Sequence, residues 1–156
     1  MANTQYLTQI VEPFVVQWVS NRLGIPLKPL RLEVSPRTDG SMVHFCFDGV
    51  SDDQMTALLV STSYTVKPGG TRKLHVDASI LLNTPLSRRL MAFISKDVAT
   101  NFMNQCDGLL PLRKIEILVC NSLPSEMQAR IAEIQTAARN EVGDKGKIWK
   151  PGGRRK

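Results

Sequence analysis

The sequence predicts an α/β fold in which helices cover both faces of a mixed sheet. Three observations support this prediction. Apolar residues recur at helical spacing before Gly24. Three strand-like runs with turn residues between them follow, and the second half then alternates helical and strand patterns, as in parallel strands joined by crossover helices. The expected order is αβββαβ followed by αβα, with a single α/β domain over residues 1–143 and a flexible basic tail over 144–156.

Each expected element has a local signal in the sequence. Gly24 and Pro26 end the first helix, and Pro13 either begins its main part or kinks a longer helix. Ser95 is placed to cap a later helix, and Gly143 to end the last one. The expected elements are a helix from Leu7 to Leu23, strands over 30–34, 42–48 and 56–62, a helix over 72–82, a strand over 90–94, a helix over 97–106, a strand over 115–120 and a helix over 124–141.

The net charge of +6 is concentrated at the C-terminal end. From Asp144 onward, six cations and one acid give +5, which leaves +1 for the rest of the chain. Three widely spaced cysteines without a CxxC pair indicate neither a disulfide framework nor a zinc module. No apolar run is long enough to span a membrane, and a cytoplasmic location is therefore expected.

The strand ending at Asp48 carries polar groups on one face. His44, Cys46 and Asp48 share that face because strand side chains alternate with period 2. A half-buried histidine and a core cysteine explain the first two, since His75 is the only other histidine and a zinc site needs more ligands. Asp48 is the candidate metal ligand, although an aspartate before Gly49 also suits a turn.

Four further residues complete a candidate site for phosphodiester hydrolysis. Glu12 is the second candidate ligand; two carboxylates suit Mg²⁺, although helix-dipole stabilisation also accounts for Glu12. Lys73, at an expected helix start, is placed to meet a phosphate, and the hydroxyls of Ser61 and Ser63 follow the third strand. Those hydroxyls also suit backbone hydrogen bonding, and Asp77 is expected to be a solvated charge.

The tail resembles a phosphate-binding arm with an indole that stacks on a base. A solubilising or partner-docking tail is the alternative. The expected nucleic-acid-binding residues are Lys67 and Arg72 near the candidate site, and Lys145, Lys147, Trp149, Lys150, Arg154, Arg155 and Lys156 in the tail.

Over roughly residues 10–94, the element order and these residues resemble the restriction-endonuclease-like core of the PD-(D/E)XK superfamily. The resemblance implies an acid near the end of the second strand, which Asp48 matches, and a glutamate from the first helix, which Glu12 matches. It also implies an acid-x-lysine motif on the third strand, where this chain has Val60-Ser61-Thr62-Ser63 instead. Some family members take the lysine from the following helix, where Lys73 stands, with Lys67 in the preceding loop as the alternative.

Three functions follow as alternatives. The first is a Mg²⁺-dependent endonuclease that acts on nucleic acid, DNA in the first place. The second is a non-catalytic module of the same fold that binds nucleic acid, a protein partner or a second copy of the chain. The third is an interaction protein that docks onto a larger assembly through its basic tail and through the acidic turn between the second and third strands, which carries Asp52 and Asp53. The missing acid-x-lysine motif favours the second, and relocated site residues favour the first.

Overall fold

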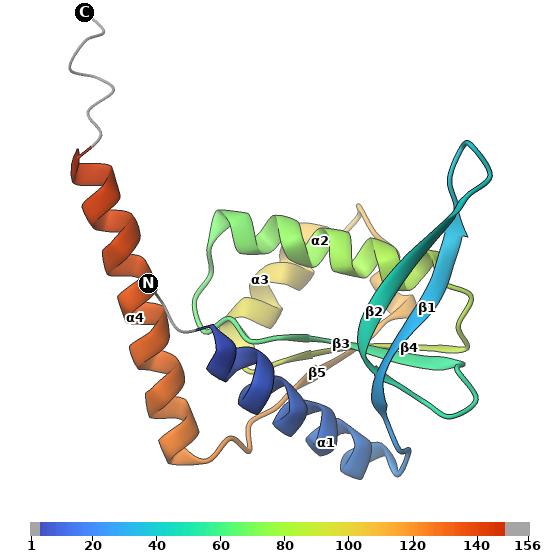
Figure 1. Cartoon of the computed structure of the whole chain (residues 1–156), viewed down its shortest axis with the longest axis horizontal. Coiled ribbons are helices and arrows are strands. Elements are labelled where there is room, and N and C mark those ends of the chain that lie inside the picture. Colours follow the sequence, from blue (N-terminus) through green and yellow to red (C-terminus); the bar gives the residue numbers. More distant parts are fainter. Residues whose placement is uncertain (1–3, 149–156) are drawn as a thin grey trace, which may run out of the picture.

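The computed structural model describes residues 4–148, except for the side chains of Pro68 and of residues 139–148 (Figure 1). The elements are a π-helical turn (Leu7–Val11), α1 (Glu12–Leu23), β1 (Lys28–Pro36), β2 (Met42–Val50), β3 (Thr56–Ser61), α2 (Pro68–Asn83), β4 (Arg88–Phe93), α3 (Lys96–Cys106), a 3₁₀ turn (Leu112–Lys114), β5 (Glu116–Val119) and α4 (Ser125–Ile148). Within the described residues, no helix has the length and apolar character needed to cross a membrane.

The five strands form one mixed sheet in the order β1-β2-β3-β4-β5, which confirms the α/β class. β1, β2 and β3 are antiparallel neighbours along the chain. β4 and β5 each pair parallel to the preceding strand, because α2 and α3 return the chain to the same end of the sheet.

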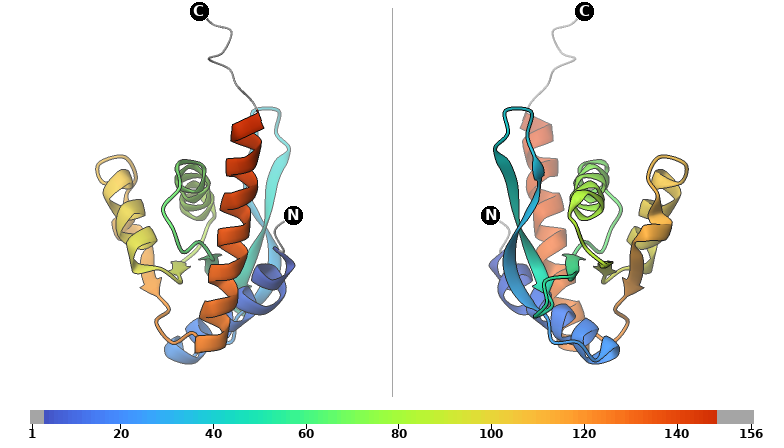
Figure 2. Two further views of the ribbon diagram at one scale, coloured as in Figure 1. Left: turned by 90° about the vertical axis from the view of Figure 1, so that its left-hand side faces the viewer. Right: turned by 90° about the vertical axis from the view of Figure 1, so that its right-hand side faces the viewer.

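Two apolar clusters cover the two faces of the sheet. On one face, α2 and α3 pack through side chains such as Ala78 and Phe102, both fully buried. On the other face, α1 and α4 pack through Val15 and Ile131, which are also fully buried. The two pairs of helices lie on opposite sides of the strands in Figure 2. A buried valine or isoleucine stabilises the fold by about 1.5–3 kcal/mol, so the periodic apolar stripes determine where each helix docks.

The first helix and the second strand differ from the expectations in detail. The backbone is helical from Leu7, but one π-helical turn precedes α1, and Pro13, which lacks an N–H, stands in the first turn of α1. Gly24 ends α1 in the left-handed conformation with φ 68°, as expected. β2 does not end at Asp48: it continues through Gly49 and Val50, which pair with β3. The turn interpretation of Asp48 is therefore wrong.

Two helix boundaries were also predicted incorrectly. α2 begins at Pro68 with Lys67 as its N-cap, because proline suits the first turn of a helix. The helix expected over 72–82 therefore begins four residues earlier, and the Thr71 hydroxyl donates to the Lys67 carbonyl at 3.2 Å. α4 passes through Gly143 to Ile148, so the helix end that was expected near Gly143 is wrong. A helix tolerates an internal glycine at a cost of about 1 kcal/mol, and no proline interrupts this stretch.

Candidate active site

The sheet forks between β2 and β3, and Asp48 lies at the fork. The two strands pair only at Gly49 with Leu58 and at Val50 with Ala57. Beyond these pairs, β2 continues with β1 as a hairpin that extends away from β3 (Figure 1). The Asp48 carboxylate accepts a hydrogen bond from the Val60 backbone N–H at 2.7 Å. The Asp48 side chain thus binds the β3 backbone at the point where the β2 backbone no longer pairs with β3. This hydrogen bond fixes the position of one Asp48 oxygen.

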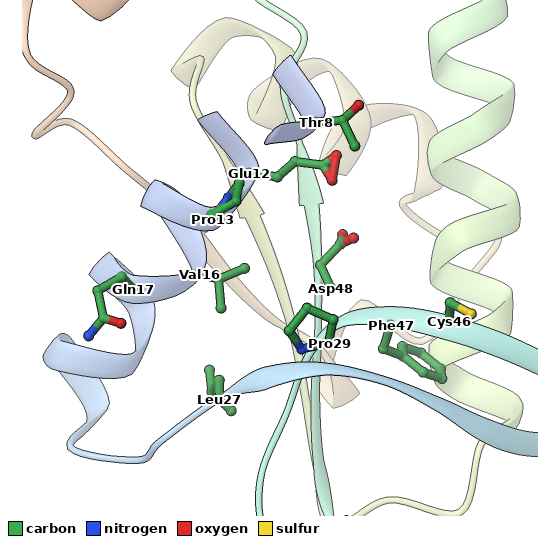
Figure 3. Close-up of a pocket in the computed structure, with 10 residues that line it drawn as sticks. All are labelled: Thr8, Glu12, Pro13, Val16, Gln17, Leu27, Pro29, Cys46, Phe47 and Asp48. Carbon is green, nitrogen blue, oxygen red and sulfur yellow. The ribbon is translucent and has the colours of Figure 1, made fainter. Parts of the chain in front are cut away.

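Glu12 is the first residue of α1, and its side chain lies beside Asp48 of β2 (Figure 3). The two side chains lie close together and line the same cavity (Figure 3). Burial, then the Asp48 charge and a hydrogen bond to the Asp48 carboxylate, together raise the pKa of Glu12 to about 7, against the opposing charge of Lys73. Burial also raises the pKa of Asp48, although the Val60 N–H and the Lys73 charge oppose this shift. Below about pH 7, Glu12 is therefore the protonated member of the pair and donates a hydrogen bond to the Asp48 carboxylate.

Lys73 is the cation that acts on this pair. Its charge lowers the pKa of both Glu12 and Asp48. It lies in the second turn of α2, not at the expected helix start, and its amino group lies 3.8 Å from an Asp77 carboxylate oxygen. Three predicted site residues, Glu12, Asp48 and Lys73, are therefore brought together by α1, β2 and α2.

Asp77 is the residue that sequence reasoning missed. It was expected to be solvated, but only 8% of it is exposed. Burial raises its pKa, Lys73 opposes this shift, and the Asp48 charge adds to it. A signal for its burial was present: Leu74, Asp77, Ala78 and Leu81 follow the i, i+3, i+4, i+7 spacing of one helix face. Asp77 therefore belongs to the charged cluster of the fork.

Ser61, Ser63, Lys67 and Arg72 lie on the segment that runs from the end of β3 into α2. Ser61 ends β3 two residues after Leu59, which packs on the α2 side, and strand alternation places both on that face. Ser63 and Lys67 line a small hollow at the start of α2, and Arg72 lines another between α2 and α3. None of the described contacts joins these residues to the carboxyl pair. The side chains of Lys145 and Lys147, and all of Trp149, Lys150, Arg154, Arg155 and Lys156, lie outside the described part of the chain.

His44 and Cys46 do not take the positions that were expected of them. His44 is exposed, and its Nε2 lies 3.7 Å from a carboxylate oxygen of Glu33 on β1. Cys46 is exposed, not a core residue, and lines the cavity next to Asp48. Among the described residues, no three or more His, Cys, Asp or Glu side chains are arranged to hold a metal ion. A cation at the fork would therefore have two protein carboxylates as ligands.

Comparisons with protein-family models, with curated proteins and with solved structures each gave no match.

Proposed function

We propose that this protein hydrolyses phosphodiester bonds of nucleic acid at the fork of a restriction-endonuclease-like core, with DNA as the expected substrate. One observation carries the proposal. Glu12 and Asp48, far apart in sequence, line the same end of one cavity beside the cation of Lys73, and burial raises the pKa of both acids. Neighbouring acids whose pKa values are raised by burial are typical of functional sites, because a fold selected for stability alone avoids them.

The architecture supports the same proposal. The chain passes through α1, the antiparallel strands β1, β2 and β3, then α2, and reaches β4 parallel to β3. This is the arrangement that the proposed family resemblance requires. The missing acid-x-lysine motif of β3 has a substitute in Lys73 and Asp77. Residues four apart share one face of a helix, as residues two apart share one face of a strand. An acid and a lysine thus reach the fork from α2.

The donor set of the fork fits Mg²⁺. Glu12 and Asp48 would hold the ion, and water or phosphate oxygens would complete its shell, since Mg²⁺ often binds through only one or two carboxylates. When bound, the ion lowers the pKa of a water and offsets the negative charge of the phosphate. Val60 fixes Asp48 through its N–H, and Lys73 offers a second positive charge to the phosphate. Asp77 orients the Lys73 amino group.

Cleavage assays test the proposal directly. We expect the wild-type protein to cleave plasmid or single-stranded DNA with Mg²⁺ or Mn²⁺. Asp48→Asn and Glu12→Gln should each lower the rate by on the order of 10²–10³-fold, the loss typical of removing one electrostatic contact to a transition state. Glu133→Gln is the matched control, because it neutralises an exposed acid on α4. Absence of cleavage with both metals, or cleavage that survives Asp48→Asn, would contradict the proposal.

A non-catalytic nucleic-acid-binding module of the same fold is the second candidate. It is favoured because no group of three or more His, Cys, Asp or Glu side chains in the described part of the chain is arranged to hold a metal ion. This candidate predicts that wild-type protein and Asp48→Asn bind DNA equally and that neither cleaves it.

The nucleic-acid partner can be tested apart from cleavage. Truncation after Ile148 removes four cations, Lys150, Arg154, Arg155 and Lys156, together with Trp149. Each phosphate contact contributes about 0.7–0.9 to the slope of log affinity against log salt, so loss of four contacts should flatten that slope by about 3. Fluorescence anisotropy with a labelled oligonucleotide measures the slope, and an unchanged slope would remove the tail from the interface.

A further inference from the structure

A cavity of about 420 Å³ opens between α1 and the β1–β2 hairpin, beside the carboxyl pair. Its walls are mostly apolar, and the two acids stand at one end (Figure 3). Those walls are formed by Pro13 and Val16 of α1, Leu27 of the loop before β1, Pro29 of β1 and Phe47 of β2. Its volume falls in the range of about 300–1,000 Å³ that is usual for small-molecule sites.

The backbone explains why this space exists. Gly49 of β2 approaches α1 so closely that an added Cβ would lie 3.3 Å from Val16 Cγ1 and 3.2 Å from Leu27 Cβ. On the other wall, the register of β1 against β2 shifts between Lys28 and Leu30, and Pro29 stands at that irregularity. The contact at Gly49 and the break at Pro29 belong to the fold itself, so the cavity does not depend on one mobile side chain.

The chemistry of the walls restricts what the cavity can take. A phosphate is disfavoured inside it, because the two acids at its end repel negative charge and, apart from the polar side chains of Thr8 and Gln17, the walls are mostly apolar and without a cation. A flat, uncharged heteroaromatic ring suits the walls, since it gains from apolar contact while its polar edge faces the acids. A nucleotide whose phosphate lies at Glu12, Asp48 and Lys73 carries such a ring at a short distance from that phosphate.

We propose that the cavity between α1 and the β1–β2 hairpin binds one unstacked nucleobase next to the phosphodiester at the carboxyl pair. The inference rests on the proposed hydrolysis of nucleic acid and specifies its substrate. A base inside a duplex cannot enter such a cavity without leaving its partner. The substrate is therefore single-stranded, or a duplex at a mismatch, flap or end, where unstacking costs little.

Cys46 provides a direct probe of this site in the unmodified protein. It lines the cavity and is exposed, whereas Cys106 and Cys120 are buried and burial raises the pKa of both thiols. Iodoacetamide should therefore react first at Cys46, and loss of that fast reaction in Cys46→Ser identifies it. Because so small a ligand binds with millimolar affinity, we expect thymidine at about 10 mM to slow the reaction about fivefold. 2-Deoxyribose at the same concentration should not slow it.

The outcomes of this assay are distinct. Absence of protection by thymidine and by deoxyadenosine overturns the nucleobase site, even if the protein cleaves DNA. Equal protection by an apolar solute such as cyclohexanol also overturns it, because the cavity is then a general apolar groove. Protection without any cleavage keeps the nucleobase site and contradicts the proposed hydrolysis. No divalent metal is needed, so the two proposals fail separately.

A second measurement uses cleavage itself. We expect a single-stranded oligonucleotide to be cut at least about tenfold faster than the same sequence in a perfect duplex, because base unstacking costs a few kcal/mol in the duplex. An abasic position should reduce cleavage at the adjoining phosphodiester, because no base can then enter the cavity. Equal rates on single strand and duplex would overturn the inference.

Discussion

The sheet holds charged residues in two opposite ways. On the β4–β5 side, Arg88 donates from Nη2 to a Glu116 carboxylate oxygen at 2.9 Å and from Nε to the other oxygen. The pKa of Glu116 is lowered by these bonds, as in an ordinary ion pair. At the fork, Glu12 and Asp48 meet each other instead, and the pKa of each is raised. Of these two sites, the fork is the one where acids with raised pKa values lie beside each other.

The backbone differs in the same way between the two halves. β3 and β4 pair without a shift from Thr56 with Arg88 to Ser61 with Phe93, and β5 continues the parallel ladder. β2 and β3 share only two pairs and then separate. Both halves contribute to the core, but only at the fork do two acids line the cavity beside α1. The acids with raised pKa values therefore lie where β2 and β3 stop pairing, and such a concentration of perturbed acids is typical of functional sites.

Removal of one cation from each region should give the largest contrast. Lys73→Met should lower DNA cleavage by on the order of 100-fold for two reasons. The phosphate loses a protein cation, and the carboxyl pair loses Lys73, which is the cation among the described groups that lowers the pKa of both acids. Arg88→Met removes an equal charge from the ion pair and should leave cleavage within about twofold. Initial rates on a labelled oligonucleotide measure both variants. Equal losses in the two would refute a special role for Lys73.

Neutralising one acid in each region should change stability in opposite directions. Glu12→Gln should stabilise the fold at pH 8 by on the order of 1 kcal/mol, less than the pKa shift alone would give, because water screens the charge of a half-buried group. The direction of the pKa shift determines how the free energy of unfolding changes with pH. Between pH 4.5 and about 7 the folded protein holds a proton that the unfolded chain has lost, so the free energy of unfolding falls as pH rises. Urea titrations of wild type and Glu12→Gln at pH 5 and pH 8 measure this change in the free energy of unfolding.

The control for this stability test is the pH dependence itself. Wild type should lose stability between pH 5 and pH 8 by more than Glu12→Gln does, and the two should converge at pH 5. If Glu12→Gln were less stable than wild type at pH 8, the carboxyl pair would be an ordinary hydrogen-bonded contact and the contrast with Glu116 would disappear.

The elements could be predicted from the sequence because each depends on local signals. Val15 and Val19 repeat at helical spacing, and Gly24 adopts the left-handed conformation that a helix end favours. Glu12 and Asp48 could be singled out as acids at a helix start and in a strand. The end of α4 was missed because glycine weakens a helix by only about 1 kcal/mol, which is less than a stop signal requires.

The fork could not be predicted, because it depends on where β2 stops pairing with β3, and the side-chain pattern of the two strands does not show how far their ladder extends. Without the fork, nothing in the sequence shows that Val60 holds Asp48 or that α1 and α2 approach the same carboxylate. Asp77 was missed for a different reason: its polarity was given more weight than its position on the buried face of α2. Position within the apolar stripe is the better guide.

The smallest expected effect concerns the paired region. Glu116→Gln should destabilise the protein by only a few tenths of a kcal/mol at pH 7, because the pair with Arg88 is largely solvent-exposed and water screens it. Its pH dependence should run opposite to that of Glu12: since the Glu116 pKa is lowered, the stabilisation is present above its ordinary pKa and is lost as pH falls through the lowered one. A double-mutant cycle with Arg88→Met, measured by urea unfolding at pH 3 and pH 7, isolates the coupling. A coupling that grows at pH 3 would mean that Glu116, like the acids of the fork, is not an ordinary ion-pair partner.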